Sequence, residues 1–121
     1  MKKTEILSYG LYVRSQIHTW HFQTHSYAEH KALDWFYTDF LELFDTFVET
    51  YQGIFDRVRV SKEYHIMDYV DIWHTKSFLA EYIWNLKALK TDIWDDYSDL
   101  QNIIDEMIWL WNQTLYLLSL K

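Results

Sequence analysis

The sequence predicts an all-α fold, a four-helix up-and-down bundle formed by residues 1–121 as a single domain. Half of the residues are hydrophobic and 20% are aromatic, a composition that supplies a core and excludes a disordered or low-complexity chain. There is no proline and there are only two glycines, too few turn-forming residues for a fold made of tight hairpins. Apolar residues also recur at steps of three and four along four stretches, as they do in amphipathic helices.

The first two predicted helices span residues 4–26 and 28–52. In the first, the apolar stripe runs through Ile6, Gly10, Val13, Ile17 and either Trp20 or His21. Gly10 is expected to let a second helix approach closely. The second stripe stops at Gly53, a residue typical of helix C-termini. Because the link between the two helices is so short, we expect them to form an antiparallel hairpin.

The rest of the chain predicts a long connection and two further helices. Residues 54–71 carry short alternating pieces, which predict a loop, either an irregular crossover or a small hairpin. Helical spacing returns over residues 75–91, with Thr75 as the expected N-cap, and over residues 98–120, with Ser98 or Asp99 as the cap. One long connection between helices two and three is the arrangement of ferritin-like bundles.

Charge and composition exclude several classes of function. Eleven basic residues against 18 acidic ones give a net charge of -7, which disfavours nucleic acid as a partner. The sequence has no cysteine, so it offers no disulfide and no thiolate metal site. The longest apolar run, Met107 to Trp111, is far too short to span a membrane and no signal peptide is recognised, so we expect a soluble protein with no membrane partner. Without a phosphate-binding loop or a nucleophile elbow, hydrolase chemistry has no support.

Histidines are the least ordinary feature of the sequence. Four of the six, His18, His21, His25 and His30, lie within 13 positions around the predicted hairpin. On an ideal helix the first three span roughly 60° of the cylinder. We therefore expect them to face a common site.

Carboxylates on the second predicted helix extend the candidate ligand set. Asp45 and Glu49 are one turn apart, and Asp34 lies one turn after His30. Imidazoles and carboxylates from neighbouring helices suit iron, manganese or zinc, and a divalent cation would relieve the repulsion between adjacent carboxylates. The alternative is structural: the histidines take part in packing, and the carboxylates form a solvated edge of the helix.

Several stretches of the chain resemble a family of small uncharacterised helical proteins of tailed bacteriophages. These stretches are His21–His30 (HFQTHSYAEH), Asp45–Glu49 with the Gln52-Gly53 pair, Asp99–Met107 and Asn112–Leu117. The resemblance covers nearly the whole chain and is weakest over residues 54–91. It implies a phage protein located in the host cytoplasm or associated with the virion.

More remotely, the first two predicted helices are similar to the Dps mini-ferritins, in which two histidines and an Asp-x-x-x-Glu pair form an iron-oxidising site across a two-fold dimer interface. Phe22 stands where those proteins have tryptophan, and their basic DNA-binding tail is missing here, which argues against iron storage in a closed shell. The resemblance implies ligands for iron or another divalent metal at His21, His30, Asp45 and Glu49, with His18 as the alternative to His21, and with His25 and Asp34 as secondary groups.

The sequence therefore leaves two functions open. One is a ferritin-like metal-binding protein with ferroxidase activity; the other is a non-catalytic phage structural or interaction module on the same fold, which binds a phage or host protein. In both cases we expect a homo-oligomer built from two-fold dimers, because seven tryptophans cannot all face the interior of so small a bundle. These are Trp20, Trp35, Trp73, Trp84, Trp94, Trp109 and Trp111.

Overall fold

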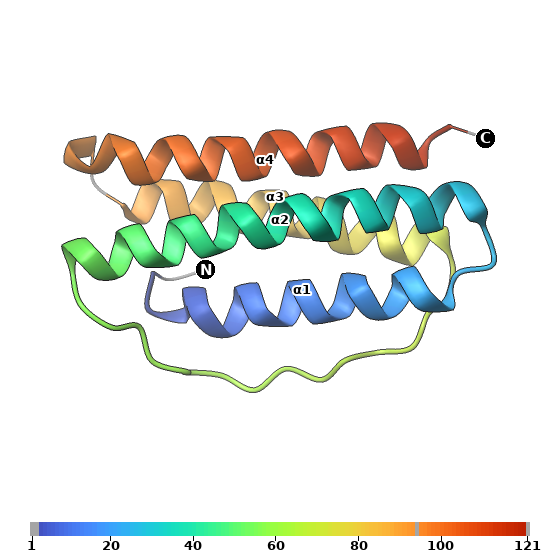
Figure 1. The fold of residues 1–121 in the computed structure, drawn as a ribbon, viewed down its shortest axis with the longest axis horizontal. Helices are drawn as coiled ribbons and strands as arrows, with labels where there is room; N and C mark the ends of the chain where they lie inside the picture. Colours follow the sequence, from blue (N-terminus) through green and yellow to red (C-terminus); the bar gives the residue numbers. More distant parts are fainter. Residues whose placement is uncertain (1–2, 94, 121) are drawn as a thin grey trace.

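Four long helices form the protein in the computed structural model, which describes residues 3–93 and 95–120. The elements in order are η1 (Lys3–Glu5), α1 (Ile6–Gln23), α2 (Tyr27–Ile54), α3 (Ile72–Asp92), η2 (Asp95–Tyr97) and α4 (Ser98–Leu118). The described residues contain no β-strand, so the all-α prediction is confirmed for this part of the chain. The helices lie side by side in a bundle, with α2 packed on α1 and α4, and α3 packed on α4 (Figure 1).

A single crossover sets the directions of the helices. Residues 55–71 run along the length of the bundle, from the end of α2 back to the start of α3 (Figure 1). As a result α2 and α3 point the same way, whereas α1 and α2, and likewise α3 and α4, are antiparallel neighbours. This crossover is the long connection that the sequence predicts, and it takes the irregular form; the hairpin alternative is wrong, since no strand occurs among its residues.

The α1–α2 hairpin is closed by Thr24, His25 and Ser26, as the short link predicts. Ser26 is the N-cap of α2, and its hydroxyl oxygen accepts a hydrogen bond from the backbone N–H of Glu29 at 3.2 Å. A cap of this kind satisfies one of the donors left over at the start of a helix. It ends the link and fixes where α2 begins.

Two predicted N-caps and one predicted C-terminal residue need correction. The N-cap of α3 is Asp71 rather than Thr75, because the Asp71 carboxylate accepts from the N–H of His74 at 2.8 Å and starts the helix one turn earlier. The residue before α4 is Tyr97, and its side chain makes no capping bond, so neither Ser98 nor Asp99 is the cap. Gly53 lies inside the last turn of α2, which continues to Ile54. For α2 and α3 the apolar stripe did not reach the true end, whereas the predicted start of α4 at residue 98 is confirmed and only its cap was misassigned.

The crossover is held on α1 by side chains two turns apart. Gln16, which is 0% exposed, donates its amide to the carbonyl of Met67 at 2.9 Å and accepts from the N–H of Met67 at 2.8 Å. Ser8 accepts from the N–H of Ser61 at 2.8 Å, and Gln23 accepts from the N–H of Tyr69 at 2.7 Å. An extended segment has no backbone partners of its own, so these side chains supply them.

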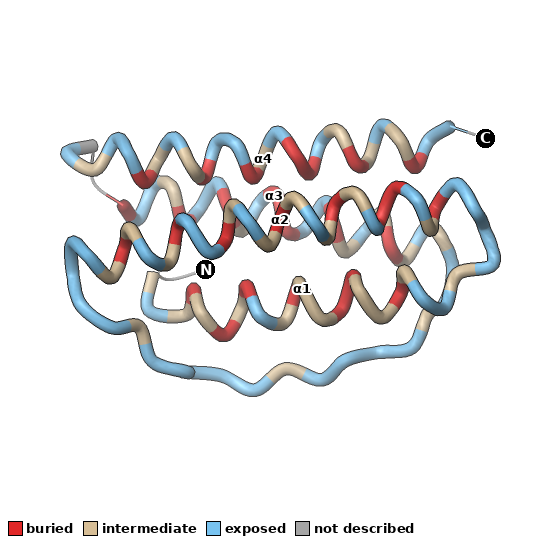
Figure 2. The backbone as a smooth tube through the Cα atoms, in the orientation of Figure 1, coloured by how far each residue is buried: buried red, intermediate tan, exposed pale blue. Residues whose placement is uncertain are grey.

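Buried positions lie along the seam where the helices meet (Figure 2). Many of the residues at these positions are aromatic, and their rings fill the core. The ring of Trp111 on α4 stacks on Tyr82 at 4.3 Å and meets the edge of Phe36 at 4.2 Å. Gly10 of α1 is also buried, and a Cβ atom added there would overlap the ring of Phe44 on α2. The predicted close approach of a helix at Gly10 is therefore confirmed.

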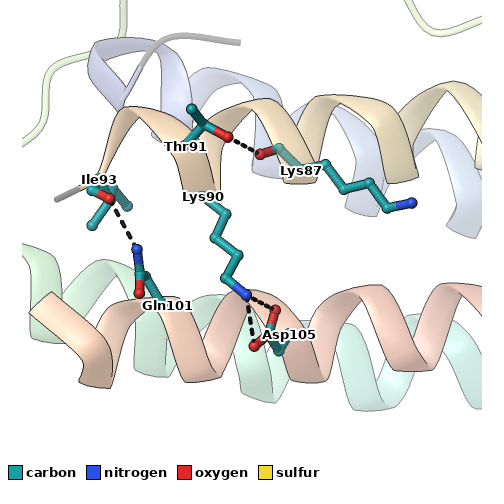
Figure 3. Close-up of polar contacts among 6 residues, drawn as sticks. All are labelled: Lys87, Lys90, Thr91, Ile93, Gln101 and Asp105. Atoms are coloured by element: carbon teal, nitrogen blue, oxygen red, sulfur yellow. Dashed lines mark hydrogen bonds and ion pairs between the residues drawn. The ribbon is translucent and has the colours of Figure 1, made fainter. Parts of the chain in front are cut away.

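Polar contacts fasten the α3–α4 turn at one end of the bundle. The ammonium of Lys90 lies 2.8 and 3.0 Å from the two carboxylate oxygens of Asp105, which joins α3 to α4 (Figure 3). The amide of Gln101 donates to the carbonyl of Ile93 at 3.1 Å, just after the end of α3 (Figure 3). The first contact joins the two helices, and the second joins α4 to the residue that follows α3.

Candidate functional site

The candidate histidines meet beside the α1–α2 hairpin. The rings of His21 and His30 are stacked with centroids 4.1 Å apart, and His18 lies 5.8 Å from His21 on the same face of α1. The ring of His18 also stacks on Tyr37 at 4.1 Å. The structure therefore brings together three of the four clustered histidines, and it buries much of their surface between aromatic rings.

Hydrogen bonding fixes one tautomer in this cluster. The Nδ1 atom of His30 lies 2.8 Å from the carbonyl oxygen of His21, and since a carbonyl can only accept, Nδ1 carries the proton. In the neutral ring, Nε2 of His30 then has a free lone pair. This is the form in which a histidine can bind a metal ion, and the backbone carbonyl orients it.

His21 is the electrostatically unusual member of the cluster. Its side chain is 12% exposed, and its Nε2 atom lies 3.6 Å from a carboxylate oxygen of Asp34. Burial, with a smaller effect of the neighbouring His30, lowers the pKa of His21, and Asp34 opposes the change only in part. The neutral form of His21 is thus favoured in the folded protein.

The carboxylates expected to share a metal with these histidines lie elsewhere. Asp45 and Glu49 are exposed on α2, and about 22 Å of helix separates Asp45 from His30 at about 1.5 Å per residue. Within residues 3–93 and 95–120 no group of three or more histidine or acidic side chains is placed to hold a metal ion. The set His21, His30, Asp45 and Glu49 does not converge within one chain, and its convergence across a dimer axis stays a prediction.

His25 is also separate from the cluster. It is exposed in the hairpin link and lines a surface hollow with Gln23, Asp68 and Tyr69 of α1 and the crossover. Of the secondary groups, only Asp34 is therefore near His21. The hypothesis that all three histidines of the first helix face one site is wrong for His25, since α1 ends at Gln23 and the chain leaves the helix before it.

A buried carboxylate beside the hairpin was missed by sequence reasoning. Glu29 is buried, and its Oε2 atom accepts from the Tyr69 hydroxyl at 2.8 Å and from the Thr24 hydroxyl at 3.0 Å. Burial and this contact raise the pKa of Tyr69. The Ser-x-x-Glu spacing from Ser26 to Glu29 is the signal that could have found it, because it marks the start of a helix. The contact ties the crossover to the hairpin.

Exposed tryptophans form a second feature that the fold leaves uncovered. Trp73 and Trp84 on α3 are 71% and 72% exposed, and their spacing of about three turns places them on one face. Between them lie the small, exposed residues Ser77 and Ala80. The ammonium of Lys76 sits 4.7 Å from the ring of Trp73. We call the surface of Trp73, Ser77, Ala80 and Trp84 the α3 tryptophan face.

A groove between α2 and α4 is the third feature, and its volume is about 620 Å³. Leu43 of α2 and Ile103 and Trp109 of α4 supply its apolar lining, and Trp109 is 57% exposed. Carboxylates also line it, at Asp39, Glu42 and Glu106. We call this surface the α2–α4 groove. It was missed because sequence alone does not show which face of α4 meets α2.

The expected excess of tryptophan over what the core can hold is confirmed for the described residues. Trp20 and Trp111 are fully buried and Trp35 is half-buried, whereas Trp73, Trp84 and Trp109 are more than half exposed. Trp94 lies outside the described residues.

In the described ranges no helix combines the length and the unbroken apolar sequence that crossing a bilayer requires.

These observations define a small all-helical protein whose distinctive surfaces are aromatic and whose candidate metal ligands do not meet within one chain. It belongs to the family of unknown function DUF5856, whose family model matches residues 21–118. It is also similar to the "Uncharacterized 14.6 kDa protein in mobD-ri intergenic region" of Enterobacteria phage T4, with 27% identity over 121 residues that cover 99% of this chain and 90% of that protein. No solved structure matches the chain. The resemblance to an uncharacterised phage family is thereby confirmed, while neither match is to a ferritin.

Proposed function

We propose that the chain is a phage interaction module that works by binding other protein chains and carries out no catalysis of its own. The observation that carries this proposal is the α3 tryptophan face, on which two tryptophans are more than two-thirds exposed. Large exposed aromatic side chains are typical of protein interfaces, where tryptophan is among the residues that contribute most to binding. The partner is a protein of the virion or of the host, or a second copy of the chain.

Small residues between the two tryptophans support a protein partner. Ser77 and Ala80 leave a low surface between two bulky rings, so another helix can approach closely there. The ammoniums of Lys76 and Lys87 lie 4.7 and 5.4 Å from the rings of Trp73 and Trp84, and they hold the rings at the surface. Such preset side chains lose little conformational freedom on binding.

A photo-crosslinking residue placed at position 84 tests the proposal in phage-infected cells. We expect a discrete protein adduct from Trp84, because this position would lie inside the interface, and the mass of the adduct identifies the partner as another protein or a second copy. Tyr116 on α4 is the matched control, since it is also an exposed aromatic residue but is not on the α3 face. Absence of a discrete adduct from both Trp73 and Trp84 would show that the proposal is wrong.

Metal binding is the second candidate function, and the orientation of His30 favours it. Its Nε2 lone pair is free while Nδ1 donates to a backbone carbonyl, which is the usual state of a metal-binding histidine. Because His30 and Asp45 are both on α2 and about 22 Å apart, a shared ion would need a two-fold axis that sets the His30 of one subunit opposite Asp45 and Glu49 of the next. Within one chain these side chains are too far apart to bind the same ion.

Elemental analysis of protein purified without chelator tests this second candidate. Iron or another divalent metal at one ion per subunit or per dimer, lost in both His30→Ala and Glu49→Ala, would support it. His25→Ala is the control, because His25 is exposed and apart from the cluster. A wild-type protein that assembles without bound metal would exclude the metal-binding function and leave the interaction module.

A further inference from the structure

Charged residues are segregated between two sides of the molecule. After Lys31, α2 has no lysine or arginine, and α4 has none at all, while the two helices carry the carboxylates of the α2–α4 groove. The crossover, in contrast, has three basic residues within six positions, Arg57, Arg59 and Lys62. Asp56 and Glu63 flank these residues and Lys62 pairs with Glu5 at 3.1 Å, so the positive charge that the crossover can offer a partner lies on Arg57 and Arg59, opposite in sign to the acidic α2–α4 side.

The α2–α4 groove is an apolar surface with carboxylates at its edges. Leu43, Ile103 and Trp109 line it, and the ring of Trp109 meets that of Trp35 edge-on at 6.4 Å, which supports it from the α2 side. Asp39, Glu42 and Glu106 make no ion pair with any residue in the described part of the chain. The groove consequently suits an occupant that combines apolar side chains with positive charge.

The first part of the crossover has this combination. Arg57, Arg59 and Val60 are all exposed, and the side chain of Val60 is 72% exposed. Backbone contacts hold the segment in place at both ends: the N–H of Val58 donates to Gln52 at 3.0 Å, and that of Ser61 donates to Ser8 at 2.8 Å. Because it is already ordered, the segment would lose little conformational entropy on binding.

We propose that the crossover segment Arg57–Val60 of one copy docks in the α2–α4 groove of a second copy. Arg57 and Arg59 then face Asp39, Glu42 and Glu106, and Val60 contacts the apolar lining beside Trp109. This inference rests on the proposed function, because it names a second copy of the chain as one of the proteins bound. It also adds a surface distinct from the α3 tryptophan face.

The two surfaces cannot meet within one molecule. In Figure 1, α4 lies along one long edge of the bundle and the crossover lies along the opposite edge, outside α1. Contact between them therefore joins different copies head to tail. Such a heterologous contact builds a ring if the rotation closes and a filament if it does not, whereas a two-fold contact would stop at a dimer.

Two charge reversals test the proposal by sedimentation over a range of protein concentrations at low salt. Glu42→Lys and Arg59→Glu are each expected to weaken the head-to-tail contact by about tenfold, because each puts like charges opposite one another. An equimolar mixture of the two variants should regain the wild-type association, since the lysine introduced into one variant then faces the glutamate introduced into the other. Added salt should weaken the wild-type contact.

Asp96→Lys is the matched control for Glu42→Lys, because it makes the same change in net charge outside the groove and should associate like the wild type. The proposal is overturned if the single reversals associate like the wild type, or if the mixture associates no better than either variant alone. Either of these sedimentation results would contradict only the head-to-tail contact. The proposed function would still be supported if the crosslinker at position 84 gives an adduct. If positions 73 and 84 give no adduct but the mixture regains association, the proposed function through the α3 tryptophan face is wrong and the head-to-tail contact stands.

Discussion

His21 is the residue at which burial and charge oppose each other most directly. Burial and the neighbouring His30 ring disfavour a positive charge on His21, and the partly exposed Asp34 carboxylate at 3.6 Å favours one. The balance lowers the pKa of His21, with burial as the largest cause. The folded protein therefore takes up a proton here less readily than the unfolded chain does.

This difference predicts that the free energy of unfolding falls in mild acid. The contribution of His21 is fully present above the ordinary histidine pKa of about 6.5 and is lost as the pH falls through the lower pKa of the folded state. Urea unfolding across this range should show a weaker pH dependence for His21→Gln than for the wild type. The exposed His25 provides the control, His25→Gln, which should keep the wild-type dependence. An unchanged slope in His21→Gln would contradict the prediction.

Gly10 shows how one residue decides the approach of two helices. A Cβ atom at this position would overlap the ring of Phe44, so Gly10→Ala should lower the free energy of unfolding by about 1–2 kcal/mol even though alanine favours helix. Gly53→Ala is the matched control, because nothing lies within 4 Å of its added Cβ; there the substitution should raise the free energy by up to about 1 kcal/mol. Thermal unfolding of the two variants should show opposite signs, and equal signs would count against this packing.

At the scale of the elements, the attachment of the crossover depends on polar side chains that hydropathy does not reveal. Gln16 is buried and forms both hydrogen bonds to Met67, whereas Gln23 is exposed and forms a similar contact further along. Loss of a buried hydrogen-bond partner lowers the free energy of unfolding more than loss of a solvated one, since water cannot take the place of the buried partner. The crossover should therefore depend on Gln16 far more than on Gln23.

We expect Gln16→Leu to lower the free energy of unfolding by about 1–3 kcal/mol and to speed hydrogen exchange at the amide of Met67. Gln23→Leu should cost less and affect mainly the amide of Tyr69. Hydrogen exchange at amides in the middle of α4 should stay slow in both variants. The hydrogen bonds that are lost join α1 to the crossover, and none of them involves α4. Equal losses of stability in the two variants would contradict the role assigned to burial.

The helices could be predicted from sequence because each one buries a continuous stripe. Phe36, Phe40, Phe44, Phe47 and Tyr51 recur at helical spacing on α2, and all five are buried. The path of the crossover could not be predicted, since contacts with distant residues such as Gln16 decide it. The start of α3 was placed at residue 75 instead of Ile72, because the Asp71 cap and not the apolar stripe sets this boundary, whereas the predicted start of α4 at residue 98 is confirmed.

The candidate site was predicted in part. The hairpin placed His21 beside His30 as expected, because a short link leaves antiparallel helices in contact. Asp45 could not join them in the same chain, and the reason was readable in advance: residues 30 and 45 of one helix are about 22 Å apart. The α2–α4 groove could not be foreseen, because it depends on how α4 is rotated about its own axis when it packs on α2.

For the whole molecule, the two unpartnered surfaces imply different symmetries. The α3 tryptophan face suits a two-fold contact, because in an antiparallel pair of α3 helices Trp73 of one copy lies near Trp84 of the other, and Ser77 and Ala80 let the helices approach. The α2–α4 groove suits a head-to-tail contact with the crossover. Together the two contacts would link dimers into larger assemblies. Of the two, only the α3–α3 contact favours assemblies with an even number of copies.

We therefore predict a homo-oligomer in which species with an even number of copies dominate a native mass spectrum. The double variant Trp73→Ser/Trp84→Ser should lose this preference while keeping its helical circular dichroism, because both side chains are exposed and contribute little to the core. Arg59→Glu should keep the dimer and lose the larger species, since it changes only the head-to-tail contact. Light scattering that gives the monomer mass of 15.0 kDa for the wild type at micromolar concentration would contradict both contacts at once.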